Sequence, residues 1–256
     1  MKIAVLVKRV PDTASVFTIR EDGKSVDLSG LNFVMSPYDE HAVEQGIRLR
    51  DEAGGEVIIV CAGPPECKET IRSGLAMGAD SGIHITGVEE MTACGLAETL
   101  AAALKRLSPD IVFAGKQAVD SDGSQVPERV AELMGVQHAS CITKFAFQTG
   151  KAIVEREVEG GSYRLAVELP ALFTAQKSLN TPRYPTLPNI MKAKRKSIEE
   201  LAVTDLALEA AVTAPGLAVE RMSLPRQSRR CTVLEGEVTG QVHALVHALH
   251  EDEKVL

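Results

Sequence analysis

The first half of the chain alternates short apolar runs with longer segments of helical periodicity, and this alternation constrains the fold most. The short runs are rich in β-branched residues and cover residues 3–7, 57–61, 82–85 and 110–114. Runs of this kind are typical of strands buried on both faces of a sheet. The helical segments between and after them cover residues 37–51, 64–77, 91–107 and 126–134. The alternation predicts an α/β fold whose mostly parallel sheet is flanked by helices.

The pattern changes after about residue 140. Strand-like segments separated by glycine-containing turns indicate added antiparallel hairpins, and they cover residues 141–147, 152–158, 163–168 and 171–174. Residues 180–189 hold three prolines, which exclude a long helix or a central strand there. A short basic helix is predicted over residues 190–201 and an amphipathic helix over residues 240–253. We therefore predict an α/β domain at residues 1–179 and an extended, partner-packing C-terminal arm at residues 180–256.

Charge and composition exclude several classes of function. The net charge of −7 opposes general binding to nucleic acids or anionic membranes, and aromatic residues make up only 4 % of the chain. No apolar run approaches the ~20 residues of a membrane span, and the first run is too short for a signal peptide. The five cysteines form no C-x-x-C pair, and the histidines of residues 243–250 favour a solvated or partner-facing helix side over a metal site. We expect a cytoplasmic protein with no catalytic residues, metal site, nucleic-acid partner or membrane insertion.

Residues 114–127 form the segment with the strongest ligand-binding character. They leave the carboxyl end of a predicted strand and enter a predicted helix, which is where open α/β sheets bind ligands. Gly115, Gly123 and Ser124 are small enough for a phosphate to approach the helix amides, whereas Asp120 and Asp122 would cap amides or bond ribose hydroxyls. Neither standard phosphate fingerprint is present, so a classical dehydrogenase or a P-loop NTPase is disfavoured. On the residues alone, nucleotide binding and an ordinary polar loop both remain open.

Residues 169–198 form a second distinctive segment. They carry six basic residues and no acidic ones, so a charge of +6 is set against −13 in the rest of the chain. Leu187 stands between Thr186 and Pro188 on the proline-rich stretch, where an apolar anchor is typical of a docking loop. Charge complementarity would then speed encounter with an acidic protein. A solvated helix face after a structural loop explains the pattern equally well.

Six motifs give the chain a resemblance to the β subunits of electron-transfer flavoproteins, over residues 1 to about 200. They are VKRVPD (7–12), MSPYDE (35–40), CKETIRSGLAMGAD (67–80), GKQAVDSDGSQ (115–125), VEREVEGG (154–161) and LNTPRYPTLPNIMKAK (179–194). The resemblance implies an adenine-nucleotide α-hydrolase-like fold and a heterodimer whose larger α subunit holds most of an FAD. It further implies that acyl-CoA dehydrogenases of fatty acid β-oxidation reduce this FAD and that a quinone-linked oxidoreductase reoxidises it.

The resemblance also assigns residues to two sites. The β subunit holds a structural AMP, whose implied contacts are Leu6, Ser36, Pro37, Tyr38, Asp39, Ala62, Gly115, Lys116, Gln117, Ala118, Val119, Asp120, Ser121, Asp122, Gly123, Ser124, Gln125 and Val126. Tyr38 aligns with an aromatic residue that approaches the flavin of the α subunit. The implied partner-docking residues are Tyr184, Leu187, Pro188, Ile190 and Met191.

Departures from the family pattern define an alternative. Ser36 stands where Asn is commoner, and Gln125-Val126-Pro127 leans toward electron-bifurcating relatives. Those relatives hold a second FAD in place of AMP and oxidise NADH. Their complete pattern is absent, because Ser121, Gly123, Ser124 and Pro127 differ from it. We therefore predict AMP and keep a bifurcating β subunit as the alternative. A stand-alone nucleotide-binding module is a third hypothesis, which the proline-rich arm disfavours.

Overall fold

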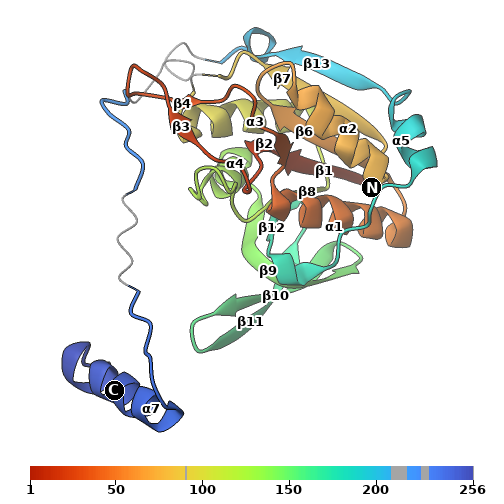
Figure 1. Cartoon of the computed structure of the whole chain (residues 1–256). Coiled ribbons are helices and arrows are strands. Elements are labelled where there is room, and N and C mark those ends of the chain that lie inside the picture. The colour runs from red at the N-terminus through yellow and green to blue at the C-terminus, as the bar shows by residue number, and fades with distance from the viewer. Residues whose placement is uncertain (90, 209–217, 226–230, 256) are drawn as a thin grey trace. The chain divides into compact units, whose positions relative to one another are not determined.

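The computed structural model describes residues 1–89, 91–208, 218–225 and 231–255 (Figure 1). The chain divides into two compact units. The first comprises Met1–Phe17 and Asp27–Glu220, and the second comprises Thr18–Val26 and Arg221–Leu256. No helix among the described residues is long and apolar enough to cross a membrane.

A nine-stranded sheet forms the centre of the first unit. Across the sheet, the strands are β11 (Gly161–Glu168), β10 (Lys151–Val158), β9 (Gln137–Gln148), β12 (Ala171–Ala175), β8 (Ile111–Gly115), β1 (Lys2–Val7), β6 (Glu56–Ala62), β7 (Ser81–Thr86) and β13 (Ile198–Ala202). Every neighbouring pair from β9 to β13 is parallel, whereas β10 and β11 add antiparallel strands at one edge. The predicted α/β fold with a mostly parallel sheet is confirmed.

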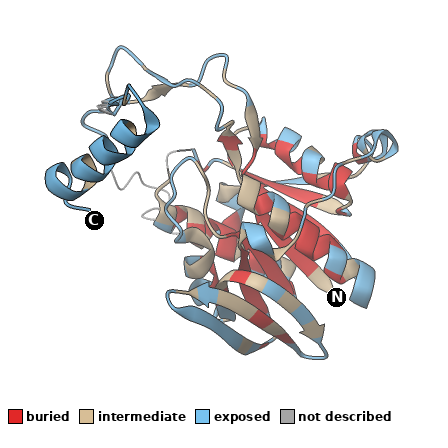
Figure 2. Ribbon diagram, turned by 60° about the horizontal axis from the view of Figure 1, so that its bottom comes forward, coloured by how far each residue is buried: buried red, intermediate tan, exposed pale blue. Residues whose placement is uncertain are grey.

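Helices cover both faces of this sheet. α1 (Pro37–Ala53) and α2 (Cys67–Met77) pack on one face, and α3 (Ala93–Leu107) and α4 (Val126–Met134) pack on the other (Figure 1). Successive side chains of a strand point to opposite faces, so Ile3 and Val5 join the first core cluster while Ala4 and Leu6 join the second. The buried residues accordingly concentrate along the central strands and the inner sides of the helices (Figure 2).

Shorter elements complete the described chain. Two small ribbons pair β2 (Arg9–Pro11) with β5 (Phe33–Met35) and β3 (Thr18–Ile19) with β4 (Val26–Asp27). The remaining elements are η1 (Lys177–Leu179), α5 (Leu187–Ala193), η2 (Val203–Leu206), α7 (Val238–His247) and η3 (Ala248–Asp252). The last two confirm the helix predicted over residues 240–253.

The basic helix predicted over residues 190–201 is wrong. α5 ends at Ala193, and residues 198–202 form the edge strand β13 instead. Ile198 and Leu201 are three residues apart, which resembles helical spacing. Three is an odd number, however, so on a strand they face opposite sides, and they pack against the first and the second core cluster, respectively. Part of the segment assigned to the C-terminal arm therefore belongs to the main sheet.

The place predicted for residues 171–174 also needs correction. The hairpins over residues 141–168 are confirmed as β9, β10 and β11, but the next strand, β12, does not extend them. It runs parallel between β8 and β9, and all five of its residues are buried. A short, mostly apolar run that is buried throughout is typical of a central parallel strand. The prediction grouped this run with the hairpins that precede it in the sequence. Residues 209–217, 226–230 and 256 of the arm expected over residues 180–256 lie outside the described residues.

Candidate functional site

A pocket lies at the carboxyl ends of β1, β6 and β8. β1 pairs with β6 on one side and with β8 on the other. The helices that follow these strands lie on opposite faces, so the sheet has its topological switch point here. Open α/β sheets bind ligands at such points. The pocket has a volume of about 300 Å³, at the lower end of the ~300–1,000 Å³ range of small-molecule sites.

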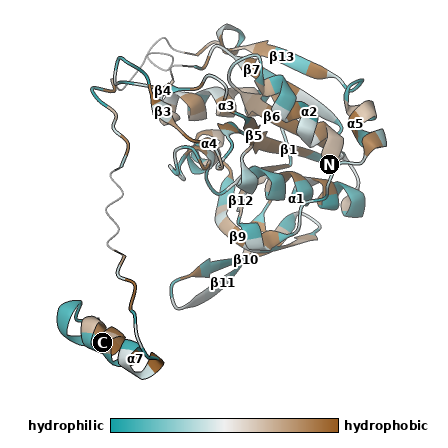
Figure 3. Ribbon diagram, in the orientation of Figure 1, coloured by the Kyte–Doolittle hydropathy of each residue, from teal (hydrophilic) through white to brown (hydrophobic). Residues whose placement is uncertain are grey.

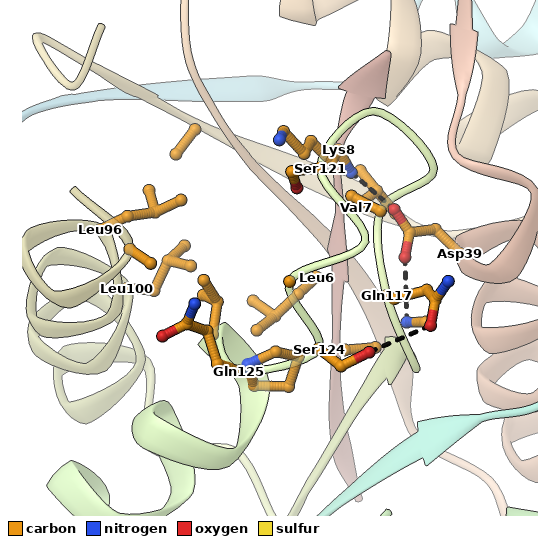
Figure 4. Close-up of a pocket in the computed structure, with 18 of the residues that line it drawn as sticks. Leu6, Val7, Lys8, Asp39, Leu96, Leu100, Gln117, Ser121, Ser124 and Gln125 are labelled. Atoms are coloured by element: carbon orange, nitrogen blue, oxygen red, sulfur yellow. Dashed lines mark hydrogen bonds between the residues drawn. The ribbon is translucent and has the colours of Figure 1, made fainter. Parts of the chain in front are cut away.

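One wall of the pocket is apolar. Leu6 of β1 and Val60 of β6 line it from the sheet, and Leu96 and Leu100 line it from α3 (Figure 4). The start of α3 is fixed by Thr92, whose hydroxyl oxygen accepts the backbone N–H of Gly95 at 3.3 Å. A wall of this composition suits a flat apolar ring such as a nucleobase.

The opposite side is the polar loop over residues 116–125, between β8 and α4. The Gln117 amide donates to Asp122 Oδ1 at 2.6 Å, and the Ser124 hydroxyl donates to Gln117 Oε1 at 3.0 Å (Figure 4). Asp122 and Ser124 both take left-handed backbone conformations, with φ of 47° and 44°. These side-chain bonds join Gln117, Asp122 and Ser124 within the loop, and Gln117 and Ser124 line the pocket.

Asp39, near the start of α1, forms the floor of the polar side. Its buried carboxylate accepts the backbone N–H of Lys8 at 2.7 Å and that of Gly115 at 2.9 Å. Burial raises the pKa of Asp39 to about 7, against the lowering effect of these two N–H groups and of the nearby Lys8 charge. Gly115 has no room for a side chain, because an added Cβ would lie 2.7 Å from Tyr38 Cβ and 2.8 Å from Asp39 N. Asp39 thus ties α1 to the ends of β1 and β8.

Lys8 and Asp120 form an ion pair at this side of the pocket. The distance from Lys8 Nζ to Asp120 Oδ2 is 2.6 Å, and the two side chains are 42 % and 27 % exposed. Among the described residues that line the pocket, Lys8 is the only basic one and Asp39 the only acidic one. Tyr38 lies beside this site, with the ammonium groups of Lys116 and Lys177 at 5.4 and 5.0 Å from its ring centre.

The structure brings most of the predicted nucleotide contacts to this pocket. Those that line it are Leu6, Asp39, Ala62, Gly115, Gln117, Ala118, Ser121, Gly123, Ser124, Gln125 and Val126. The others belong to the adjoining segments without lining it, and they are Ser36, Pro37, Tyr38, Lys116, Val119, Asp120 and Asp122. Ser36 is buried behind the loop, where its hydroxyl donates to the Gln117 carbonyl at 3.5 Å.

Several lining residues were not predicted from the sequence. They are Val7, Lys8, Val60, Ala93, Leu96 and Leu100, whereas Ala114 and Pro127 are the two ends of the segment that was predicted to bind a ligand. The strand alternation held a usable signal for them, because parallel strands end at one edge of a sheet and each following helix begins there. The residues at the end of β6 and in the first turns of α3 could therefore have been assigned to the same crevice.

A second candidate site is the proline-rich loop over residues 180–189 together with α5. Tyr184, Leu187 and Met191 are 94 %, 79 % and 60 % exposed. Ile190 and Pro188 are also exposed, and these five residues are named the exposed cluster below. Figure 3 shows that α5 contains hydrophobic residues. Apolar side chains presented to solvent in one patch are typical of an interaction site.

The loop is fixed to α1 through Glu44. This buried carboxylate accepts the Arg183 Nε–H at 2.8 Å and the Arg48 Nε–H at 2.7 Å. Burial alone would raise the pKa of Glu44, but the bonds from the two guanidinium groups outweigh it and lower the pKa. The side chain of Asn180 donates to the His41 carbonyl at 3.0 Å. The exposed cluster therefore sits on a firmly held segment.

Metal and thiol chemistry add no further site to the part of the chain that the structure describes. In that part, no group of three or more metal-ligating side chains comes together. The five cysteines are free, with Cys61 and Cys67 buried in the first core cluster.

Comparison with known proteins gives a consistent family assignment. The electron transfer flavoprotein domain family matches residues 25–206. The electron transfer flavoprotein subunit beta of Bacillus subtilis is 36 % identical over 259 residues, covering 100 % of both chains. A mitochondrial electron transfer flavoprotein subunit beta of Arabidopsis thaliana is 43 % identical over 217 residues, covering 82 % of this chain and 84 % of its own. The subunit beta of Mus musculus is 38 % identical over 225 residues, covering 86 % and 88 %.

Proposed function

The chain belongs to the electron transfer flavoprotein family as a β subunit, and we propose that it binds a structural AMP and supports an FAD held mainly by an α subunit. Members of this family are electron carriers that work with a flavin. The proposed heterodimer accepts electrons from acyl-CoA-type dehydrogenases and passes them to a quinone-linked oxidoreductase. The chain itself makes and breaks no substrate bonds.

The pocket at the switch point is the observation that carries the AMP assignment. It has one apolar wall and one polar loop, as an adenine base joined to a ribose phosphate requires. Leu6, Leu96 and Leu100 would hold the base, and the loop over residues 116–125 would hold the ribose and phosphate. A volume of about 300 Å³ lies within the range of small-molecule sites and is compatible with a nucleoside monophosphate.

The flavin would supply the electron-carrying chemistry when it is bound with the α subunit. This chain contributes to the flavin's surroundings through Tyr38, which lies half-buried beside Lys116 and Lys177. The cationic surroundings of this ring favour an electron-rich, anionic group nearby. The protein's part in such chemistry is to position the cofactor and to tune its electrostatics.

Extraction of nucleotides from the co-expressed heterodimer tests the assignment. We expect one FAD and one AMP per heterodimer. A preparation that contains no nucleotide besides the flavin would exclude AMP. Two FAD molecules per heterodimer together with NADH-dependent bleaching would establish the bifurcating alternative, which the presence of Gln125 and Val126 in the pocket lining motivates.

The exposed cluster supports the docking role. Leu187 is 79 % exposed at the start of α5 and is flanked by the basic residues of this segment, so it presents an apolar anchor in a cationic surrounding. We expect Leu187→Ala to slow electron transfer from a dehydrogenase at low dehydrogenase concentration while the flavin content stays normal. Leu133→Ala, which truncates an exposed leucine on α4, is the matched control. An unchanged rate for Leu187→Ala would refute the docking role.

A further inference from the structure

Lys8 is distinctive among the pocket residues because its charge is already paired. It is the only basic residue among the described residues lining the pocket, and its ammonium group binds Asp120 of the loop over residues 116–125. Figure 4 shows Lys8 on the same side of the pocket as Ser121 of that loop. In the structure as it stands, the polar side of the pocket therefore offers no unpaired cation among its described lining residues.

The other carboxylates near the pocket have different hydrogen-bond partners. Both oxygens of Asp39 are occupied by the backbone N–H groups of Lys8 and Gly115. The Oδ1 atom of Asp122 accepts the Gln117 amide at 2.6 Å. Among the residues that the structure describes, Asp120 is thus the carboxylate that forms an ion pair with the Lys8 ammonium, and this pair is partly exposed to solvent.

An exposed ion pair is easily exchanged. Solvent screens its attraction, and holding two long side chains in one geometry costs conformational entropy. An ammonium bound to a phosphate forms a charge-assisted hydrogen bond to a group with a higher charge density than a carboxylate. A phosphate that enters the polar side of the pocket can therefore displace Asp120 from Lys8 at little cost.

On the basis of the proposed nucleotide site, we propose that Lys8 and Asp120 act as a phosphate-specific latch. Asp120 holds the Lys8 ammonium in the pocket before binding, and the phosphate of the nucleotide takes its place. The latch gives a nucleoside monophosphate an advantage over the nucleoside, because only the phosphate gains the released ammonium. It also couples binding to the loop, since Asp120 loses its bond to Lys8, the residue that follows β1, when the ligand binds. Lys8 is then a specificity-determining residue and Asp120 its competitor.

Binding of AMP and of adenosine to the heterodimer, freed of nucleotide, tests this latch by calorimetric titration. Removal of the competitor in Asp120→Asn is expected to tighten AMP binding by up to about fivefold, which corresponds to the ~0.2–1 kcal/mol of an exposed ion pair. Lys8→Met is expected to weaken AMP binding by about tenfold or more, and Lys8→Arg to restore most of it. None of these three variants is expected to change the affinity for adenosine.

Glu155→Gln removes one carboxylate from the exposed Lys144–Glu155 pair, at 2.7 Å on β9 and β10, and is expected to leave both affinities unchanged. Equal shifts for AMP and adenosine, or weaker AMP binding in Asp120→Asn, would overturn the latch while the nucleotide site stands. If the unaltered heterodimer binds no AMP at all, the proposed function fails and the latch fails with it.

Discussion

Two acidic residues on α1, Asp39 and Glu44, are both buried and both hold a functional segment, yet their ionisation differs. Asp39 receives two backbone N–H groups, and its pKa is raised to about 7. Glu44 receives two guanidinium groups, from Arg48 and Arg183, and its pKa is lowered. At Asp39 the effect of desolvation therefore exceeds that of the neutral donors, whereas at Glu44 the cationic donors exceed the effect of desolvation.

The same helix thus positions the pocket and the proline-rich loop by different physical means. At the pocket, Asp39 joins strand ends that the sheet already places, so hydrogen bonds to backbone are sufficient. At the loop, Glu44 must hold a segment over residues 180–189 that lies outside the sheet and can form no ladder because of its prolines. Paired charges supply that anchorage. The first arrangement is sensitive to pH near neutrality, and the second is sensitive only in acid.

Removing the carboxyl group of Asp39 is expected to have the largest effect on stability. Asp39→Ala leaves the buried N–H groups of Lys8 and Gly115 without acceptors, each at a cost of about 1–3 kcal/mol, so we expect a loss of about 2–5 kcal/mol. The measurement is chemical denaturation at pH 6, below the pKa of this carboxyl group. At this pH the group is mostly uncharged, so its removal does not also remove an unfavourable buried charge. Asp39→Asn retains one acceptor and should lose less. Equal stability of the alanine variant and the parent would show that water replaces the carboxylate at this site.

The pH dependence of stability sharpens the contrast between the two carboxylates. The folded pKa of Asp39, about 7, lies above its ordinary value of 3.8, so between these values the folded chain binds more protons than the unfolded chain. The free energy of unfolding contributed by this group therefore rises as pH falls from about 7 toward about 4, by up to about 1.4 kcal/mol per pH unit. The stability difference between the parent and Asp39→Asn should change with pH over this window. A constant difference would mean that Asp39 is ionised throughout.

Glu44→Gln is expected to have a smaller effect, of about 1–2 kcal/mol, because both guanidinium groups remain partly exposed to water. The pKa of Glu44 is lowered from its ordinary value of 4.5 in the folded chain, so its contribution is present at neutral pH and is lost as pH falls through the lowered pKa. Denaturation at pH 7 and pH 3 measures this difference. Faster amide exchange over residues 180–187 should accompany the substitution, with exchange in β1 as the internal control. Unchanged exchange in the loop would show that other contacts hold it.

The sequence predicted the parts of this structure that depend on local periodicity. Four β-branched runs and four helical segments were placed within a few residues of β1, β6, β7, β8 and α1 to α4. It also placed most of the residues lining the pocket, because the loop after β8 must leave at the carboxyl edge of a parallel sheet. These features are determined by short segments of the chain.

The features that were missed depend on contacts between distant segments. Ile198 and Leu201 fit a helix or a strand equally well, and only the free edge of β7 selects the strand. The central position of β12 depends on its pairing with β8 and β9. The raised pKa of Asp39 depends on burial beneath residue 115, more than 70 positions further along the chain. No local pattern encodes such relations.

Leu187→Ala is expected to have the smallest effect on stability, within about 0.5 kcal/mol, because an exposed side chain gains little from folding. At 79 % exposure, Leu187 contributes almost nothing to the core. In Glu44→Gln, by contrast, the anchor of the same loop is weakened while the exposed cluster is intact. The stability changes of Leu187→Ala and Glu44→Gln should therefore add in the double variant, since the side chains share no bond. A loss above about 1 kcal/mol for Leu187→Ala alone would show that the leucine packs against the chain in solution, and the cluster would then be structural rather than a free docking surface.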